Sequence, residues 1–560
     1  MPRYSCVLTF CVIAAAGLYL GTVTPKAYGL AESVGPNGSN AQAVHELGET
    51  GEDVNVGLIS AKNTRTTHEA FEDTNGISHA FYYDFTDEGL YEPDNHDTWV
   101  AGVVASRGGV SYPNDIGVAP GVDIHSAKVT RGETSPSDPN RVIYFSWLAD
   151  ALDDLINDYN CQVIVTGISL GDEPNGQSDW TMLYDYYAYE HNVVFANASG
   201  KNHTHPTVFG DGYNGITTGG LVVTDPNVYL RVGSNSNIGP TEDSRRKPDL
   251  AAPSQNQTMP SGGSDNSWYT WTAADGATSL STPHTAGLAA LLLGLADETP
   301  TDDDNYNEVI KAVIVNSTFP NINDKDNNPT YPADPNNVWH PHRGYGRIDA
   351  LRAYELLNTN QVTRDVNITQ PKGWAFDTIA GQQEHTYTIQ AEKRYRLVAT
   401  LTWDRTVEWI DEKTGIPRRK NNKIDPGELH PYLADLDLKI YEPNGANTIF
   451  SKQDNGYDPS DNLIKCDFLL TAPGQYTLKV VNNSTDETTN YGLAFELLPP
   501  LPADFDLDYI VDYNDFAEIA ANWLQPGPGF DADLFQDNFI DFWDFALFAQ
   551  NWLTTDPAYH

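Results

Sequence analysis

A serine-rich segment at the start of a long apolar run is the clearest candidate for chemistry in the sequence. Ser279, Ser281 and Thr282 precede Pro283, and the apolar run continues to Ala296. Pro283 suits the first turn of a helix, and hydroxyl side chains suit its cap. A serine at a helix N-terminus could act as a nucleophile, because the helix dipole and free N–H groups stabilise an alkoxide and a neighbouring oxyanion. The segment alone is equally consistent with capping residues.

The C-terminal segment carries acidic side chains at the spacing of a calcium-binding loop. Aspartates occupy the first, third, fifth, ninth and twelfth places of an EF-hand-like loop, and a backbone carbonyl is available at the seventh. Several oxygens from one short loop are what a hard divalent cation needs, so the segment predicts bound Ca²⁺. The candidate ligands are Asp504, Asp506, Asp508, Ile510, Asp512 and Asp515.

A repeat in the same segment supplies a second loop. The run that starts at Asp512 recurs 29 residues later, and both copies end in Asn-Trp-Leu. Phe535 stands at the third place of the second loop, so this loop has one ligand fewer and should bind the cation more weakly. Its candidate ligands are Asp533, Asp537, Asp541 and Asp544.

The serine segment and a histidine segment upstream resemble a known family. Residues 276–287 are similar to the sequence around the nucleophile of subtilisin-like (S8) serine peptidases, with Ala277 in place of the family's glycine. Residues 96–102 are similar to the segment that carries the family's general base. The resemblance covers about residues 33–357. It implies acyl transfer, with Ser279 as nucleophile and His96 as general base.

Further segments match the family in the same order. Residues 117–129 resemble the strand after the histidine helix, and residues 247–253 resemble the approach to the serine loop. Residues 32–38 resemble a mature N-terminus, which leaves no room for the usual folding propeptide. The resemblance also implies that an extended peptide pairs with an edge formed by Ser169, Leu170 and Gly171.

The first strand departs from the family pattern at a catalytic position. Where the family has an aspartate, this sequence has Ser60 after the apolar run 54–59. A serine can accept a hydrogen bond from the imidazole and orient His96, but it cannot stabilise an imidazolium by charge. Removal of this aspartate in subtilisin lowers kcat by about 3 × 10⁴. Carboxylates that could replace it are Asp73, Asp84, Asp94 and Asp97.

The oxyanion position is a second departure. The family places an asparagine directly after a glycine that follows the fourth strand, whereas this chain reads Gly200-Lys201-Asn202. Either Asn202 supplies the donor after a one-residue shift, or Lys201 supplies a positive charge. Loss of such a donor typically costs about 10²–10³ in kcat.

Alternating strands and helices must position these residues. We expect strands at 54–59, 122–129, 162–166, 192–196 and 217–223, and helices at 98–106, 141–157, 178–191 and 283–296. This alternation predicts a doubly wound, mostly parallel α/β sheet with helices on both faces, which by resemblance is subtilisin-like.

Beyond residue 365 the pattern becomes one of short strands separated by turn residues. Strands at 397–403, 435–441, 465–470, 475–481 and 491–497 predict an antiparallel β-sandwich, similar to the jelly-roll domain of some S8 peptidases. The repeat after it resembles a dockerin, a small all-α module, and implies a cohesin-bearing scaffold or cell-surface protein as partner. The expected parts are a signal peptide (1–29), the peptidase domain (30–360), the sandwich (366–498), a linker (499–503) and the dockerin-like module (504–560).

Composition and the N-terminus restrict the compartment and the partners. The 77 acidic residues against 33 basic ones argue against nucleic acid, because nothing offsets phosphate repulsion. A basic start, an apolar centre and small residues before position 30 predict a cleaved signal peptide and a secreted protein, with no membrane span after its removal. Cys161 and Cys466 then remain, and we expect two buried thiols rather than a disulfide.

These observations lead to a secreted serine endopeptidase that acts on proteins or peptides, binds Ca²⁺ and is tethered through its dockerin-like module. The alternative is a catalytically impaired homologue that holds peptides or proteins without cutting them, because Ser60 replaces the aspartate. A polysaccharide-degrading enzyme is a third idea, but no pair of catalytic carboxylates in recognisable context supports it.

Overall fold

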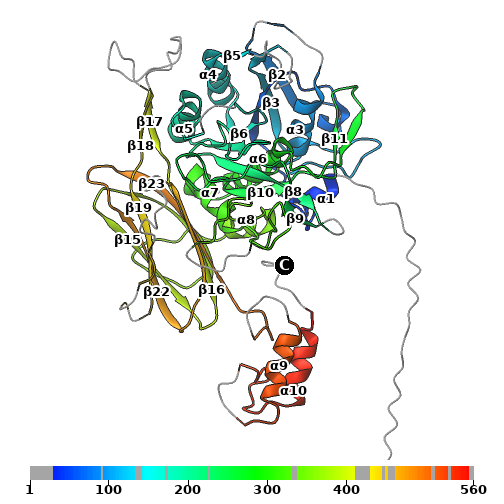
Figure 1. Ribbon diagram of the computed structural model, residues 1–560. Coiled ribbons are helices and arrows are strands. Elements are labelled where there is room, and N and C mark those ends of the chain that lie inside the picture. Colours follow the sequence, from blue (N-terminus) through cyan, green and yellow to red (C-terminus); the bar gives the residue numbers. More distant parts are fainter. Residues whose placement is uncertain are drawn as a thin grey trace, which may run out of the picture.

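Three units follow one another along the chain: an α/β unit, a β-sandwich and a small helical module (Figure 1). The computed structural model describes residues 30–86, 88–89, 93–132, 142–170, 174–224, 228–330, 337–409, 429–443, 445, 448–451, 461–505, 511–526 and 531–553. The expected signal peptide and the predicted residues Gly171, Asp506, Asp508 and Ile510 lie outside these ranges.

An eight-stranded sheet forms the centre of the α/β unit. Its hydrogen-bonded order is β10-β8-β7-β6-β1-β3-β2, all parallel, and β9 joins β8 in the antiparallel sense. Strand β1 (Asn55–Ser60) lies between β3 (Asp123–Lys128) and β6 (Cys161–Thr166), and all but its first residue are buried. The other strands are β2 (Ala80–Asp84), β7 (Val194–Ala198), β8 (Ile216–Val223), β9 (Tyr229–Val232) and β10 (Leu250–Pro253).

Helices cover both faces of this sheet. On one face, α3 (Asn95–Ala105) and α6 (Thr278–Asp297) pack in the same core as Leu58 of β1. On the other face, α4 (Phe145–Asp153) and α5 (Asp179–His191) share a core with the next residue, Ile59. Successive strand residues point to opposite faces, so this alternation divides β1 between two cores. The smaller elements of the unit are α1 (Leu30–Val34), α2 (Ala41–Glu46), η1 (Glu69–Phe71), β4 (Thr130–Arg131), β5 (Val142–Ile143), η2 (Asp154–Asp158), β11 (Gln257–Pro260), β12 (Trp268–Trp271), η3 (Asp303–Asn305) and α8 (Ala350–Leu357).

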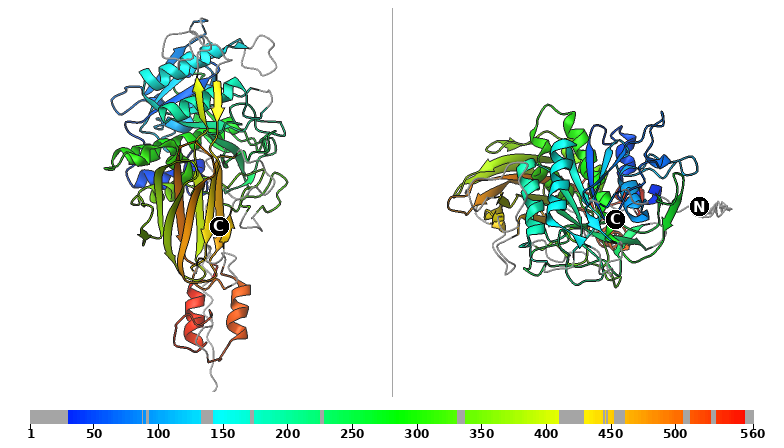
Figure 2. Two further views of the ribbon diagram at one scale, coloured as in Figure 1. Left: turned by 90° about the vertical axis from the view of Figure 1, so that its left-hand side faces the viewer. Right: turned by 90° about the horizontal axis from the view of Figure 1, so that it is seen from above.

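Two facing sheets make up the second unit, which stands beside the α/β unit in Figure 2. One sheet has the order β13-β15-β22-β19-β20 and the other β14-β23-β16-β21, and one apolar core fills the space between them. The strands are β13 (Asn367–Ile368), β14 (Lys372–Ile379), β15 (Glu384–Ala391), β16 (Arg396–Thr402), β19 (Leu436–Tyr441), β20 (Thr448–Ser451), β21 (Leu463–Leu469), β22 (Gly474–Asn482) and β23 (Thr489–Leu498).

Helix α7 (Asn307–Asn316) contacts both units, and all ten of its residues are buried. Gly492 of β23 lies directly against its first turn, where a Cβ atom would stand 2.3 Å from the Glu308 carbonyl oxygen. At the other end, Lys465 Nζ of β21 donates to the Val315 carbonyl oxygen at 2.8 Å and to Thr318 Oγ1 at 2.9 Å. Burial lowers the pKa of the Lys465 ammonium to about 7. The sandwich therefore completes the hydrogen bonding of a helix that belongs to the α/β unit.

A β-hairpin makes a further contact between the sandwich and the α/β unit. Strands β17 (Thr406–Trp409) and β18 (Leu429–Tyr432) pair with each other, and Val407, Trp409 and Leu429 belong to the core beneath α4 and α5. The hairpin thus covers apolar surface of the α/β unit that would otherwise face water.

The helical module consists of α9 (Tyr513–Ala521) and α10 (Phe542–Gln550) around a small apolar core. Each helix begins with a capping box, formed by Asp512 with Asp515 and by Asp541 with Asp544. Across the whole described chain, every helix is too short or too polar to cross a bilayer.

The prediction of a parallel α/β sheet is confirmed, and a β-rich region follows it as expected. The five expected strands appear as β1, β3, β6, β7 and β8, each shifted by at most two residues. The helix expected at 141–157 is divided into α4 and the π-helical turn η2, with residue 141 outside the described part. Cys161 and Cys466 are buried free thiols, as expected. Helix α7 and the β17–β18 hairpin were not predicted.

Candidate active site

Helix α3 places a histidine at its exposed N-terminal end. Asp94 is the N-cap, and its side chain accepts a hydrogen bond from the His96 backbone N–H at 2.9 Å. The rest of the helix is held by burial, and Gly102 lies so close to Pro260 that a Cβ atom would stand 2.3 Å from its ring. The His96 side chain is 37% exposed. The backbone of His96 is therefore fixed by the helix cap, and its imidazole is accessible from solvent.

Helix α6 presents a serine in its first turn. Gly276 enters the helix with φ +73, and a Cβ atom there would lie 2.8 Å from the Cα of Gly233. This approach requires glycine, because other residues rarely adopt such a φ and none would fit the space. Thr278 Oγ1 bonds to both the N–H and the carbonyl of Gly200, each at 3.2 Å. Ser279, next in the chain, is partly exposed.

The two helices bring a base and a hydroxyl together. His96 Nε2 and Ser279 Oγ are 2.9 Å apart, although the residues are 183 positions apart in the sequence. A hydroxyl that donates to Nε2 leaves the proton of a neutral imidazole on Nδ1. The pair therefore has the geometry of a serine nucleophile and its general base.

The carboxylate that faces Nδ1 belongs to Asp97. Its Oδ1 atom lies 3.4 Å from His96 Nδ1, and its Oδ2 atom accepts a hydrogen bond from the Lys62 backbone N–H at 2.6 Å. The Asp97 side chain is 1% exposed. A carboxylate from α3 thus reaches the chain just beyond the carboxyl end of β1, the place where the family has its aspartate. Burial and the charge of Asp97 raise the pKa of neighbouring Asp94 above its usual range.

Ser60 lies in a separate hydrogen-bond chain. It is fully buried at the end of β1, and its hydroxyl donates to the Lys62 carbonyl oxygen at 3.0 Å. The Ser60 hydroxyl oxygen itself accepts from Ser126 Oγ at 3.2 Å, and Ser126 in turn accepts from Thr64 Oγ1 at 2.8 Å. The orienting role of Ser60 stays a prediction, whereas the geometry favours Asp97.

The two oxyanion candidates differ in their surroundings. Asn202 is exposed with φ 68, and its backbone N–H donates to the Asn235 carbonyl oxygen at 2.9 Å. Lys201 forms an ion pair with Asp275, four residues before Ser279, and its ammonium lies 5.9 Å from the centroid of the Trp271 ring. Asn202 stays a prediction, and Lys201 is the candidate with a charge fixed beside the serine loop.

The expected substrate edge begins beside the histidine. A Cβ atom on Gly167 would lie 3.6 Å from His96 Cε1, so the chain after β6 passes the imidazole. Ser169 and Leu170 follow, both partly exposed, and Leu170 forms an antiparallel bridge with Val208. The position of these two residues suits an extended substrate that crosses the Ser279–His96 pair.

The carboxylates of the C-terminal module fit a cation only in part. Asp504 and Asp515 of the first loop are buried, and a set of carboxylate oxygens suits Ca²⁺. Asp515 accepts from the backbone N–H groups of Phe505 at 2.5 Å and Asp512 at 2.8 Å. In the second loop Asp544 is buried and plays the equivalent capping role, while Asp533, Asp537 and Asp541 accept bonds from nearby backbone N–H groups.

Among the residues that the structure describes, ligand atoms close enough to hold one metal ion occur at the N-terminus of α3. Within the described residues the one group of three ligand atoms within 4.8 Å of one another is Asp94, His96 and Asp97, not a set from the module loops. Calcium binding by the module therefore stays a prediction that rests on the sequence spacing and on the buried carboxylates.

Sequence reasoning named the nucleophile, the base and the substrate edge, but it left the acid open among four aspartates. A signal for Asp97 was present, because an aspartate stands at the family's glycine, directly after the histidine. No sequence signal pointed to Arg405 of the sandwich, which is buried against this edge region.

A serine hydroxyl within hydrogen-bonding distance of a histidine at the carboxyl end of a parallel α/β sheet is an arrangement found in subtilisin-like serine peptidases. The chain belongs to the subtilase family, since the model of that family (Peptidase S8) matches residues 49–346. Subtilisin NAT of Bacillus subtilis subsp. natto is 28% identical over 255 residues, which are 45% of this chain and 58% of that relative. The match thus spans just over half of the relative's length.

Two solved protease structures align with part of the chain. The prenylagaramide maturation protease PagA is 18% identical, with a TM-score of 0.42, and the match covers 56% of this chain and 98% of that one. A serine-to-alanine mutant of the protease domain of PatA is 18% identical, with a TM-score of 0.41. That match covers 55% of this chain and 95% of the PatA chain.

The site geometry predicts different effects of removing Asp97 and Ser60. Asp97→Asn keeps the shape but removes the charge that would stabilise a protonated His96, so kcat should fall by about 10³- to 10⁴-fold. Ser60→Ala should cost far less. Steady-state kinetics on a chromogenic peptide, with circular dichroism to check folding, measures both. The opposite ranking would assign the orienting role to Ser60.

Proposed function

We propose that the protein is a secreted serine endopeptidase in which Ser279 is the nucleophile, His96 the general base and Asp97 the orienting acid. The observation that carries the proposal is the 2.9 Å contact between Ser279 Oγ and His96 Nε2. Family membership supports a peptidase function, and the partly exposed serine and imidazole make the pair accessible to a substrate.

The proposed reaction runs through an acyl-enzyme. Ser279 Oγ attacks a peptide carbonyl carbon while His96 Nε2 takes its proton, and the buried Asp97 carboxylate stabilises the imidazolium. The imidazolium then gives the proton to the leaving amine. A water molecule then enters, gives a proton to Nε2 and attacks the acyl carbon. The imidazolium returns this proton to Ser279 Oγ as the ester bond breaks, and the acyl group leaves as a free carboxylic acid. The N-terminus of α6 and the Lys201 ammonium favour negative charge on the carbonyl oxygen.

The second candidate is a peptide-binding homologue that does not cleave. The 3.4 Å separation between Asp97 Oδ1 and His96 Nδ1 is long for a hydrogen bond, and Asn202 is exposed. Both observations favour a weakened site. A direct test of nucleophilicity separates the two candidates.

We expect the purified protein to react covalently with a fluorophosphonate probe, because His96 activates the Ser279 hydroxyl. Ser279→Ala should abolish labelling, and His96→Ala should slow it by about 10³-fold or more. Ser281→Ala is the matched control, since this buried serine of the same helix bonds to the Thr278 carbonyl oxygen and should not affect labelling. Labelling is followed by mass spectrometry. Equal behaviour of wild type and Ser279→Ala would support the binding protein instead.

Export and cleavage after Gly29 are part of the proposal, and the environment of Leu30 supports them. The Leu30 backbone nitrogen is buried and lies 2.6 Å from Asp115 Oδ1. Burial raises the pKa of the Asp115 carboxyl to about 6. Cleavage after Gly29 would convert the Leu30 amide into an ammonium, which would give this buried carboxylate a counter-charge.

This arrangement predicts a pH-dependent difference between two forms of the protein. In a chain with Gly-Ser before Leu30, Asp115 has a native pKa of about 6 against 3.8 for an ordinary carboxyl, so its stability should fall as pH rises from about 4 to 6. In a chain that starts at Leu30, the ammonium offsets that loss. Denaturant unfolding at several pH values measures the difference, which should widen with pH and disappear in Asp115→Asn. A constant difference would exclude the ion pair.

Tethering through the C-terminal module is the remaining part of the proposal. Exposed aromatic side chains lie on both helices, including Tyr513, Phe542 and Trp543. Such a face suits a protein partner, and resemblance to dockerins suggests a cohesin domain on a scaffold or cell surface.

Calcium should bind the first loop of this module more tightly than the second. Isothermal titration of the full chain, after removal of divalent ions with EGTA, should show two steps. Asp504→Ala should remove the tighter step and Asp533→Ala the weaker one, because each aspartate holds the first place of its loop. The two variants control for each other. Absence of a calcium-dependent heat would reduce these aspartates to helix caps.

A further inference from the structure

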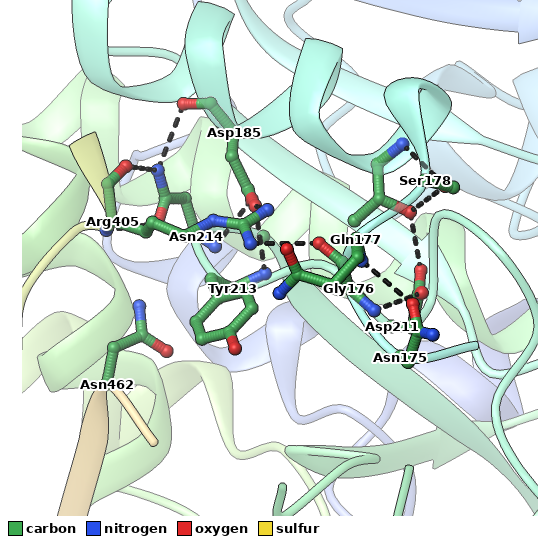
Figure 3. A network of polar contacts seen from close by, with 12 residues as sticks. Asn175, Gly176, Gln177, Ser178, Asp185, Asp211, Tyr213, Asn214, Arg405 and Asn462 are labelled. Carbon is green, nitrogen blue, oxygen red and sulfur yellow. Dashed lines mark hydrogen bonds and ion pairs between the residues drawn. The ribbon is translucent and has the colours of Figure 1, made fainter. Parts of the chain in front are cut away.

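Arg405 crosses from the sandwich into the peptidase domain. It lies in the turn between β16 and β17 and is 2% exposed. Its backbone N–H donates to Asn214 Oδ1 at 2.7 Å, and its carbonyl oxygen accepts from Asn214 Nδ2 at 2.8 Å. One asparagine thus fixes both polar backbone groups of Arg405, and the side chain extends beyond it into the neighbouring domain (Figure 3).

The guanidinium group has three partners, all in the peptidase domain. It forms an ion pair with Asp185 of α5, and its Nη1 atom donates to the Gly176 carbonyl oxygen at 2.8 Å. It also lies 4.0 Å from the centroid of the Tyr213 ring. A second buried guanidinium, that of Arg245, lies 3.8 Å from the same centroid. A desolvated cation over the face of an aromatic ring is a stabilising contact.

The loop at Gly176 is held through both backbone polar groups of this residue. Asp211 Oδ2 accepts from the Gly176 N–H at 2.8 Å, while Arg405 binds the carbonyl. Gly176 has φ +73, and a Cβ atom would lie 2.4 Å from Arg245 Nη2 and 2.7 Å from Tyr213 Cε2. No other residue fits this position, so the backbone of the loop has little freedom.

This loop continues the substrate edge. Leu170 pairs with Val208, and further along the same two segments Gly176 bonds to Asp211. The two contacts therefore join Leu170 and Gly176 to the segment 207–214. Arg405 of the sandwich adds a further contact at Gly176, to its carbonyl oxygen. A shift of Gly176 would reach Leu170 through the segment 208–211, because Val208 pairs with Leu170 and Asp211 accepts from Gly176.

We propose that Arg405 of the β-sandwich is a positioning residue for the substrate edge Ser169–Leu170. The sandwich then acts on peptide recognition, because it supplies the group that fixes the loop behind that edge. The inference rests on the proposed function, in that a peptide must bind at this edge.

The main test compares Arg405→Met with Lys465→Met. Both residues are buried sandwich cations that donate to backbone carbonyls of the peptidase domain, but Lys465 contacts the end of α7 and not the loop at Gly176. We expect Arg405→Met to weaken peptide binding by about 10-fold, since a displaced edge would lose roughly one backbone hydrogen bond to the peptide, and such a loss has about this effect on Kd. KM should rise while kcat changes less. Lys465→Met should lower stability and leave KM unchanged.

Binding is measured independently of turnover. The probe is oxidised insulin B chain, and its Kd is determined on the full chain carrying Ser279→Ala, with and without the second substitution. Hydrogen exchange of segment 174–178 should accelerate in Arg405→Met and stay slow in Lys465→Met. Added guanidinium ion at millimolar concentration should restore both affinity and protection in Arg405→Ala, where it can occupy the vacated space, and should have no effect on Arg405→Met.

Two results would overturn the inference. One is an equal loss of affinity in both variants when they are compared at temperatures that give equal unfolding free energy. The other is unchanged affinity, or no binding of the B chain at all, in the Ser279→Ala protein. Failure of the proposed function has a separate signature, namely absence of fluorophosphonate labelling in the wild type while binding and its dependence on Arg405 persist.

Discussion

Burial of α7 between the peptidase domain and the sandwich is the constraint on which the rest of the structure depends. None of its residues is exposed, and several of its polar groups bond to groups in the two domains. Thr402 and Lys465 of the sandwich bond to backbone carbonyls at its two ends, and Lys311 of the helix donates to the Tyr213 carbonyl oxygen at 2.7 Å. The two domains therefore form one cooperative body rather than two units on a flexible connection.

Buried charges in the peptidase domain and the sandwich belong to a chain with many acidic and few basic residues. With 33 basic residues against 77 acidic ones, several of the few cations are buried, Arg245, Arg343 and Arg405 among them. Each is matched by carbonyls, carboxylates or an aromatic ring. Burial raises the pKa of Glu308 to about 7 and, together with Glu308, raises that of Asp404 well above its usual range. A proton on this pair removes a charge that the interior would otherwise have to solvate.

In the proposed mechanism, one catalytic requirement is met from a different element than in the family pattern. An imidazole that takes a proton needs a buried negative charge near Nδ1, but the position of that charge in the chain is free as long as the geometry is kept. Strand β1 ends in Ser60, and helix α3 supplies Asp97, whose carboxylate is fixed by the Lys62 backbone N–H. Since Asp97 is next to His96 on a rigid helix, the base and its acid move as one element.

The sequence by itself determined the parallel α/β sheet, the strands of its centre, the β-rich region and the Ser279–His96 pair. Each of these features can be recognised locally, because apolar periodicity and short motifs are patterns of residues close together in the sequence. The tertiary structure decided which carboxylate faces His96, since the sequence left four aspartates open and the 3.4 Å approach of Asp97 Oδ1 to Nδ1 selects one of them. It also decided the role of α7 and Arg405. Their partners lie on strands and loops up to some 230 positions away, and such contacts arise only when the two domains pack together.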